Sequence, residues 1–184
     1  MNMTTQRRYA LAIDSRKCID CKACVVACRA ENGVPLEYSR NWVREELHGE
    51  WPQLKAAFEP GQCQHCDDPA CVRVCPTGAS RKRSDGIVVV DEDECVGCRY
   101  CIMACPYQAR FFREDRGVVE KCDFCAHRLE AGRLPACVET CPSKVRVFGD
   151  LNDPNSRLNK LLATRRYEVK KPEAGTGPQI YYLL

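Results

Sequence analysis

The cysteines constrain this chain more than any other feature of its sequence. The chain has 184 residues, and 16 of them are cysteines. They form four closely spaced groups of four, and no cysteine is left over. The groups are Cys18, Cys21, Cys24 and Cys28; Cys63, Cys66, Cys71 and Cys75; Cys95, Cys98, Cys101 and Cys105; and Cys122, Cys125, Cys137 and Cys141. Any fold of this chain must therefore bring many thiols close together.

The first and third groups are a repeat. The segments IDSRKCIDCKACVVAC and VDEDECVGCRYCIMAC superpose without a gap, including a strand-like apolar lead-in. The second and fourth groups share the endings PACVRVCP and PACVETCP, although the spacers after their second cysteines differ in length. Internal duplication is the simplest explanation of this pattern.

The remaining composition indicates that something besides side chains fills the interior. Only 5 Phe and 2 Trp are present, which is a thin supply for a core of this size. The net charge of +3 does not by itself indicate nucleic acid. The basic runs at 81–83 and 165–171 are interpreted as solvated loop charge rather than a nucleic-acid or lipid site.

Two features bear on compartment. No apolar run reaches the roughly eighteen residues that cross a bilayer. The twin arginine, Arg7 and Arg8, precedes an apolar stretch that is too short for a signal sequence. If the protein works outside the cytoplasm, we expect another chain to carry the export signal.

The coarse pattern predicts short elements. Strands are expected at Tyr9 to Ile13, at Ile87 to Val90 and at Val145 to Phe148, with a short helix after the third cysteine of each group. A proline follows the last cysteine of three groups and should stop those helices; these are Pro76, Pro106 and Pro142. The insert at 30–62 and the extended tail at 164–184 should pack either on their own domain or on a partner chain.

Three chemistries compete for closely spaced cysteines. Disulfides suit small secreted scaffolds, but C-x-x-C pairs rarely staple a fold. Zinc uses two pairs separated by a loop and leaves no reason for a third and fourth cysteine in one run. The run C-x-x-C-x-x-C-x-x-x-C followed by proline is the pattern of bacterial two-cluster ferredoxins, in which the fourth cysteine ligates the other cluster.

Four groups of four thiols therefore predict four [4Fe-4S] clusters that also form the missing core. Such clusters carry negative charge, and basic residues beside the ligands should offset some of it and raise the potentials. Those residues are Lys17, Lys22, Arg29, Arg73, Arg99 and Lys121. The spacing alone leaves open whether adjacent or nested groups share clusters.

The chain resembles the four-cluster iron–sulfur subunits of membrane-associated molybdopterin oxidoreductases, which act on polysulfide, thiosulfate, tetrathionate or dimethyl sulfoxide. The segments CAHRLEAGRLPACVETCP and GTGPQIYYL are most similar to the subunit of polysulfide reductase or its thiosulfate and tetrathionate relatives. The resemblance implies an α+β fold of duplicated bacterial ferredoxin-like modules, with short strands, short helices and long loops packed around four cubane clusters.

The resemblance also implies nested ligand sets, the first group pairing with the fourth and the second with the third. The implied sets are Cys18, Cys21, Cys24 and Cys141; Cys122, Cys125, Cys137 and Cys28; Cys63, Cys66, Cys71 and Cys105; and Cys95, Cys98, Cys101 and Cys75. The chain then divides into residues 1–62 (first group and insert), 63–121 (second module), 122–150 (fourth group) and 151–184 (tail).

In the resembled family the chain relays electrons between a molybdopterin catalytic subunit and an integral-membrane quinone-reactive subunit. The resemblance implies association with the membrane through these partners. The periplasmic face is expected, reached by co-export, and the cytoplasmic face is the alternative.

No catalytic site of its own is expected. The histidines are His48, His65 and His127, and none stands in a catalytic pattern. For His65 and His127 we expect hydrogen bonds to cluster sulfurs or a packed surface role. The alternatives to a complex subunit are a stand-alone polyferredoxin and a structural zinc protein.

Overall fold

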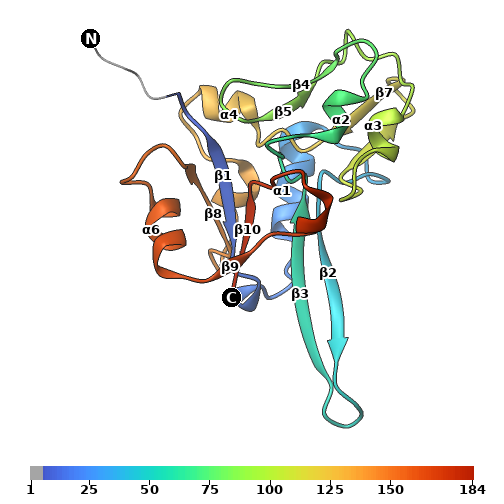
Figure 1. The fold of residues 1–184 in the computed structure, drawn as a ribbon. Coiled ribbons are helices and arrows are strands. Elements are labelled where there is room, and N and C mark those ends of the chain that lie inside the picture. Colours follow the sequence, from blue (N-terminus) through green and yellow to red (C-terminus); the bar gives the residue numbers. More distant parts are fainter. Residues whose placement is uncertain (1–5) are drawn as a thin grey trace.

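The structure is a computed structural model that describes residues 6–184 (Figure 1). Short strands and helices follow one another along the chain, so the fold is α+β as expected. The longest helix, α1 (Ala23–Asn32), has 10 residues. Over the described residues, no helix combines the length and the apolar character that a bilayer crossing requires.

The main sheet joins the two ends of the chain. Its strand order is β8-β1-β10-β9, and the strands are β1 (Tyr9–Ile13), β8 (Arg146–Asp150), β9 (Tyr167–Glu168) and β10 (Ile180–Leu183). In β1, Leu11 lies opposite Phe148 of the antiparallel β8 and opposite Ile180 of the parallel β10. The tail therefore packs on its own domain, and the pairing of β1 with β8 brings the fourth cysteine group to the first.

The two faces of β1 serve different cores because side chains alternate along a strand. Leu11 and Ile13 pack into a core to which all four cysteine groups contribute. Ala10 and Ala12 face the other way, toward Leu158 of α6 (Arg157–Thr164). Figure 1 shows α6 on the side of the sheet away from α1. Side chains alone fill this second core.

Two small hairpins follow the second and third cysteine groups along the chain. They are β4 (Ser80–Lys82) with β5 (Val88–Val90), and β6 (Arg110–Arg113) with β7 (Val118–Lys121). Each hairpin follows the last cysteine of a group and its proline. The expected strands at 9–13, 87–90 and 145–148 correspond to β1, β5 and β8, with shifts of one or two residues at the ends.

A short helix holds the third cysteine of every group. These helices are α1, α2 (Ala70–Arg73), α3 (Tyr100–Met103) and α5 (Ala136–Glu139). Each begins one residue before that cysteine, slightly earlier than predicted. The last three end before their prolines, whereas α1 has no following proline and runs on past Cys28. The helix α4 (Ala126–Glu130), in the spacer of the fourth group, and the 3-10 turns η1 (Ser15–Lys17) and η2 (Pro172–Ala174) were not predicted.

The insert forms a long hairpin, β2 (Asn41–His48) with β3 (Lys55–Gln62), which we call the arm. It projects away from the rest of the molecule (Figure 1). At its root Trp42 packs against the cysteine core, while Trp51 at its tip is 85% exposed. Trp42 therefore packs on the cysteine core, which is one of the two roles expected for the insert, whereas Trp51 remains exposed on the surface.

The basic run at 81–83 is neutralised locally. Arg81 pairs with Asp91 and Glu94 at 2.6 and 2.9 Å. Lys82 pairs with Asp67 at 2.9 Å, and Arg83 pairs with Asp85 and Glu130. These pairs agree with the interpretation of the run as surface charge.

Candidate metal centres

All sixteen cysteines are free thiols, and most of them gather around cavities. One cavity, of about 330 Å³, is lined by four thiols from both ends of the cysteine region: Cys18, Cys21, Cys24 and Cys141. Val43 and Pro60 from the root of the arm close one side of it. Three thiols thus come from the first group and one from the fourth.

Two further cavities repeat this arrangement with the second and third groups. The first measures about 330 Å³ and is lined by Cys63, Cys66, Cys71 and Cys105. The second measures about 310 Å³ and is lined by Cys75, Cys95, Cys98 and Cys101. All three cavities are lined by four thiols, so all three suit the same kind of group.

The remaining four thiols lie together in the interior. Cys28, Cys122, Cys125 and Cys137 are all buried. The Asn32 amide nitrogen lies 3.6 Å from the Cys28 sulfur and 3.8 Å from the Cys125 sulfur, which joins the first group to the fourth. Burial, followed by the neighbouring Cys137 and Cys125, raises the pKa of Cys28 to about 12. One thiol of the first group and three of the fourth therefore lie near one another here.

These sets fit iron–sulfur clusters by the chemistry of their donors. Four thiolates are the usual ligands of a cubane cluster. Within residues 6–184, no three His, Cys, Asp or Glu side chains are arranged as the ligands of a single metal ion would be. In three of the sets the four thiols instead surround a cavity.

The cysteine loops share an unusual backbone conformation. The residue before the second cysteine has a positive φ in every group; these residues are Asp20, His65, Gly97 and Phe124, with φ of 55°, 44°, 67° and 56°. Only one of them is glycine, so the conformation is held by the surroundings at some cost. Such turns are typical of nests of backbone N–H groups that bind anions, iron–sulfur clusters included.

Backbone N–H groups also point at individual sulfurs. The amide of Ser80 lies 3.3 Å from the Cys75 sulfur, that of Val145 lies 3.4 Å from Cys141, and that of Val119 lies 3.5 Å from Cys95. Burial by itself raises the pKa of the Cys75 thiol, but hydrogen bonds, first that from Ser80, lower it overall. These donors favour the thiolate form that binds metal.

Burial differs strongly between the sets. Cys21 and Cys98 are exposed, whereas the set containing Cys28 and Cys122 is buried throughout. Burial raises the pKa of Cys122 well above its usual value and raises the pKa of Cys66 to about 11. Iron must therefore displace protons from the inner thiols when it binds.

Of the six basic residues expected beside the ligands, only Lys121 is buried. Its Nζ donates to the carbonyl of Cys122 at 2.7 Å. The Arg99 guanidinium lies 3.8 Å from the centre of the Phe112 ring. Arg29 donates to backbone carbonyls, and Lys17, Lys22 and Arg73 pair with nearby aspartates. Their effect on cluster potentials stays a prediction.

The sequence reasoning missed two arginines that do contact thiols, Arg110 and Arg146. Arg110 Nη2 donates to the Cys71 sulfur at 2.9 Å, and Arg146 Nη2 lies 4.0 Å from the Cys24 sulfur. Both arginines stand five residues after the last cysteine of a group. That shared offset was the available signal.

The histidines have structural contacts. His65 is fully buried and stacks on Phe124 with 3.7 Å between ring centres. Its Nδ1 accepts a hydrogen bond from the Val88 amide at 3.1 Å, and burial lowers its pKa well below the usual 6.5, so the ring is neutral. The exposed His127 lies 2.8 Å from Glu31. The stack links the loops of the second and fourth groups.

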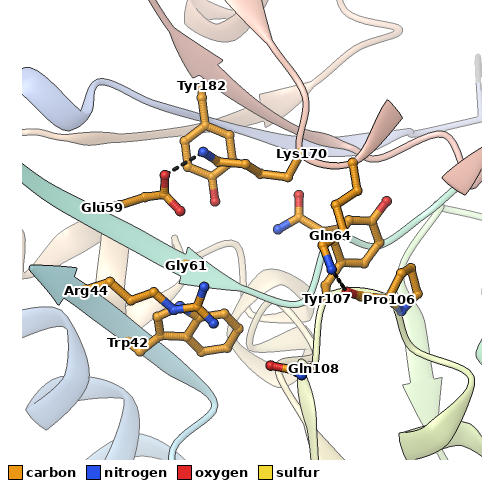
Figure 2. Close-up of a pocket in the computed structure, with 11 residues that line it drawn as sticks. Trp42, Arg44, Glu59, Gly61, Gln64, Pro106, Tyr107, Gln108, Lys170 and Tyr182 are labelled. Carbon is orange, nitrogen blue, oxygen red and sulfur yellow. Dashed lines mark hydrogen bonds and ion pairs between the residues drawn. The ribbon is translucent and has the colours of Figure 1, made fainter. Parts of the chain in front are cut away.

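Another pocket, without cysteines, lies where the arm, the third-group loop and the tail meet. Figure 2 shows Trp42 and Tyr182 on its walls, with Lys170 beside Tyr182. Lys170 forms an ion pair with Glu59 of the arm, and Lys171 donates to the carbonyl of Pro106 at 2.6 Å (Figure 2). The tail thus fastens the arm to the body of the protein.

Two family models, both described as 4Fe-4S dicluster domain, match the chain at residues 54–151 and 17–79. Together the matches include every cysteine group. Two such domains with sixteen cysteines correspond to four [4Fe-4S] clusters. This agreement removes the zinc alternative.

Curated relatives extend over nearly the whole chain. A tetrathionate reductase subunit of Salmonella typhimurium is 48% identical over 182 residues, covering 97% of this chain and 73% of the relative. The protein NrfC of Escherichia coli is 49% identical over 177 residues, covering 95% and 79%. The arsenate respiratory reductase iron–sulfur subunit of a Shewanella species is 35% identical over 226 residues, covering 96% of each chain. The chain therefore belongs to the 4Fe-4S dicluster family, among the iron–sulfur electron-transfer subunits of respiratory reductases.

Proposed function

We propose that this chain relays electrons between an integral-membrane quinone-reactive subunit and a molybdopterin catalytic subunit of a respiratory reductase for a sulfur compound. The observation that carries the proposal is the graded burial of the thiol sets. Cys21 and Cys98, in two different sets, are exposed, while the set with Cys28 is buried. A relay needs this arrangement, with two accessible ends and an insulated middle.

The proposed ligand sets are the nested ones. Cys18, Cys21, Cys24 and Cys141 hold the first cluster, and Cys28, Cys122, Cys125 and Cys137 hold the second. Cys63, Cys66, Cys71 and Cys105 hold the third, and Cys75, Cys95, Cys98 and Cys101 hold the fourth. The three shared cavities and the Asn32 contacts support this assignment. Each cluster, when bound, supplies a site that takes up or gives up one electron.

Apolar side chains surround both exposed ends. Beside Cys98, Val96, Tyr100 and Met103 are 66%, 58% and 85% exposed. Beside Cys21, Ile19 is 63% exposed. A group of exposed apolar side chains such as the one beside Cys98 is typical of an interaction surface. The exposed apolar side chains beside Cys98 and Cys21 support the proposal of two partner subunits, one at each end of the relay.

The position of the arm supports docking of the catalytic subunit at the Cys21 end. Its root lines the cavity of the Cys21 set through Val43 and Pro60, and its tip carries the exposed apolar residues Leu47, Trp51 and Leu54. A partner docked at Cys21 could therefore be clasped by the arm, with Trp51 as an anchor of the kind that dominates interfaces.

The membrane subunit is then proposed at the Cys98 end. The described residues contain no helix able to cross a bilayer, so in this proposal a separate subunit makes the contact with the quinone pool. We propose the periplasmic face of the membrane for the complex. The division of the chain at residues 62, 121 and 150 also stays a proposal.

Metal content is the first test. Anaerobically purified chain should contain about sixteen irons with matching acid-labile sulfide, and a reductive EPR titration should resolve coupled cubane signals. Zinc without sulfide would overturn the proposal. Co-expression with the two partner subunits should give a stable three-subunit complex, whereas a chain that remains alone and transfers electrons by diffusion would favour a free polyferredoxin.

The pairing of the groups needs its own test, because nested and adjacent pairing predict different outcomes. With nested pairing, Cys28→Ser and Cys122→Ser perturb the same EPR signal, and Cys18→Ser perturbs a different one. With adjacent pairing of the first two groups, neither Cys28→Ser nor Cys18→Ser affects the signal that Cys122→Ser alters. The second pattern would rule out the nested sets.

A further inference from the structure

Two buried arginines occupy equivalent places in the two halves of the molecule. Arg110 lies on β6, five residues after Cys105, and Arg146 lies on β8, five residues after Cys141. Each contacts the third cysteine of the nested partner group, Cys71 for Arg110 and Cys24 for Arg146. The same type of side chain therefore contacts the same type of ligand in two separate places.

Neither arginine is neutralised by a carboxylate. Their exposed fractions are 5% and 3%, and among residues 6–184 no Asp or Glu forms an ion pair with either. Arg113, three residues along the same strand as Arg110, is equally buried but pairs with Asp115 and Glu120, both at 2.7 Å. A buried guanidinium with no counter-charge is very costly, so the two unpaired arginines require another anionic partner.

The contacts of Arg110 identify that partner as a cluster. Its Nη2 donates to the Cys71 sulfur at 2.9 Å and to Ser80 Oγ at 2.8 Å. Its Nε and Nη1 are buried with no hydrogen-bond partner, although unsatisfied buried donors are rare. Arg110 also lines the cavity of the Cys63 set, so an anionic group bound in that cavity would lie next to this arginine.

Each arginine also lies near both thiol sets of its own half. Burial opposes the charge of Arg110, but Cys71 and Cys63 of one set and Cys101 of the other raise its pKa overall. For Arg146, burial is likewise outweighed by Cys137 and Cys24, which belong to two different sets. Arg146 lines the cavity of the Cys18 set as well. A guanidinium stays protonated in proteins, so both cations remain charged beside these thiols.

We propose that Arg110 and Arg146 tune the redox potentials of the relay, each raising the potentials of the two clusters in its own half by charge and by N–H donation to sulfur. The physical basis is that a fixed positive charge stabilises the more negative, reduced state of a cluster, and hydrogen bonds to sulfur act in the same direction. The strongest effect is expected on the cluster of the Cys63 set, which has the shortest contact. The inference rests on the ligand sets proposed above.

The test compares the wild-type chain with Arg110→Met and Arg146→Met, each carrying its clusters, in an anaerobic EPR redox titration. At a fixed solution potential, Arg110→Met should lower the reduced-to-oxidised ratio of the Cys63-set cluster at least tenfold, or about 59 mV for one electron. The clusters of the other half should not move. Arg146→Met should lower this ratio for the clusters of the first and fourth groups and leave the clusters of the second and third groups unchanged. Arg116→Met, which removes an exposed cation paired with Glu92, is the control for net charge and should leave all signals in place.

Equal shifts in all clusters, or no shift, would overturn the inference. If Arg110→Met does not retain its clusters, Arg110→Lys keeps the charge but lacks the planar fork. It should then give a smaller shift in the same direction and in the same half, and an unchanged titration would again overturn the inference. The iron content of the wild-type chain distinguishes a failure of this inference from a failure of the proposed function. About sixteen irons with unmoved potentials refutes only the role of the arginines, whereas few irons refutes the relay itself.

Discussion

Replacing Leu158 by alanine tests whether the outer core of the main sheet is independent of the clusters. Leu158 is fully buried on α6 and packs against Ala10, Ala12 and Val147. A buried Leu→Ala change costs roughly 2 to 5 kcal/mol, more where the surroundings cannot collapse. The neighbours here are small, and Gly149 directly below has no side chain to move into the void. We therefore expect a loss of about 3 to 5 kcal/mol, in the upper part of that range.

The assay is the thermal midpoint at a fixed heating rate, because loss of clusters makes unfolding irreversible. At about 2 to 4 °C per kcal/mol for a chain of this size, Leu158→Ala should lower the midpoint by roughly 6 to 20 °C. Iron content and EPR potentials at 25 °C should not change, since the side chain faces away from the cysteines. Lys160→Ala, on the exposed side of the same helix, is the control. A midpoint within about 2 °C of wild type, or shifted cluster potentials, would refute the reasoning.

Trp51 is 85% exposed at the tip of the arm, so Trp51→Ala should leave the thermal midpoint unchanged. It should weaken binding of the catalytic subunit about 30-fold, as for a typical interface tryptophan. Equal binding by the variant and the wild type would contradict the docking role. Burial raises the pKa of Cys28 to about 12 and that of Cys66 to about 11. Because the raised pKa values keep these thiols protonated in the folded state, they contribute to the stability of the iron-free fold below pH 9. That contribution to the free energy of unfolding is lost as the pH rises toward 11 to 12. Iron binding must displace those protons, so iron loading, measured by competition with a chelator, should tighten from pH 7 to 9, and a flat profile would argue against buried thiols. Because Cys21 and Cys98 are exposed, an aqueous chelator should remove the EPR signals of their clusters first; simultaneous loss of all four signals would be inconsistent with the graded burial.

Local features were readable from the sequence. The strand β1 follows from a short apolar run, and the short helices at the third cysteines follow from the cysteine spacing. The ends of α2, α3 and α5 follow from the prolines behind them, and the length of α1 follows from the absence of such a proline. The arm was not predicted as a hairpin, because its strands lack a buried face that would impose a clear alternation of apolar and polar residues.

The long-range features depended on the tertiary structure. Pairing of β1 with β8 brings Cys141 to the cavity of Cys18, a contact across most of the chain that the spacing left open. The burial of Arg110 and Arg146 likewise follows from which elements pack together, and in the sequence it is marked by no more than their shared offset from the last cysteine of a group. The sequence by itself determined the chemistry, sixteen thiols for four clusters, because the cysteines stand in four closely spaced groups of four. The tertiary structure decided which thiols of different groups line one cavity and which cations lie beside them, because these depend on segments that only folding brings together.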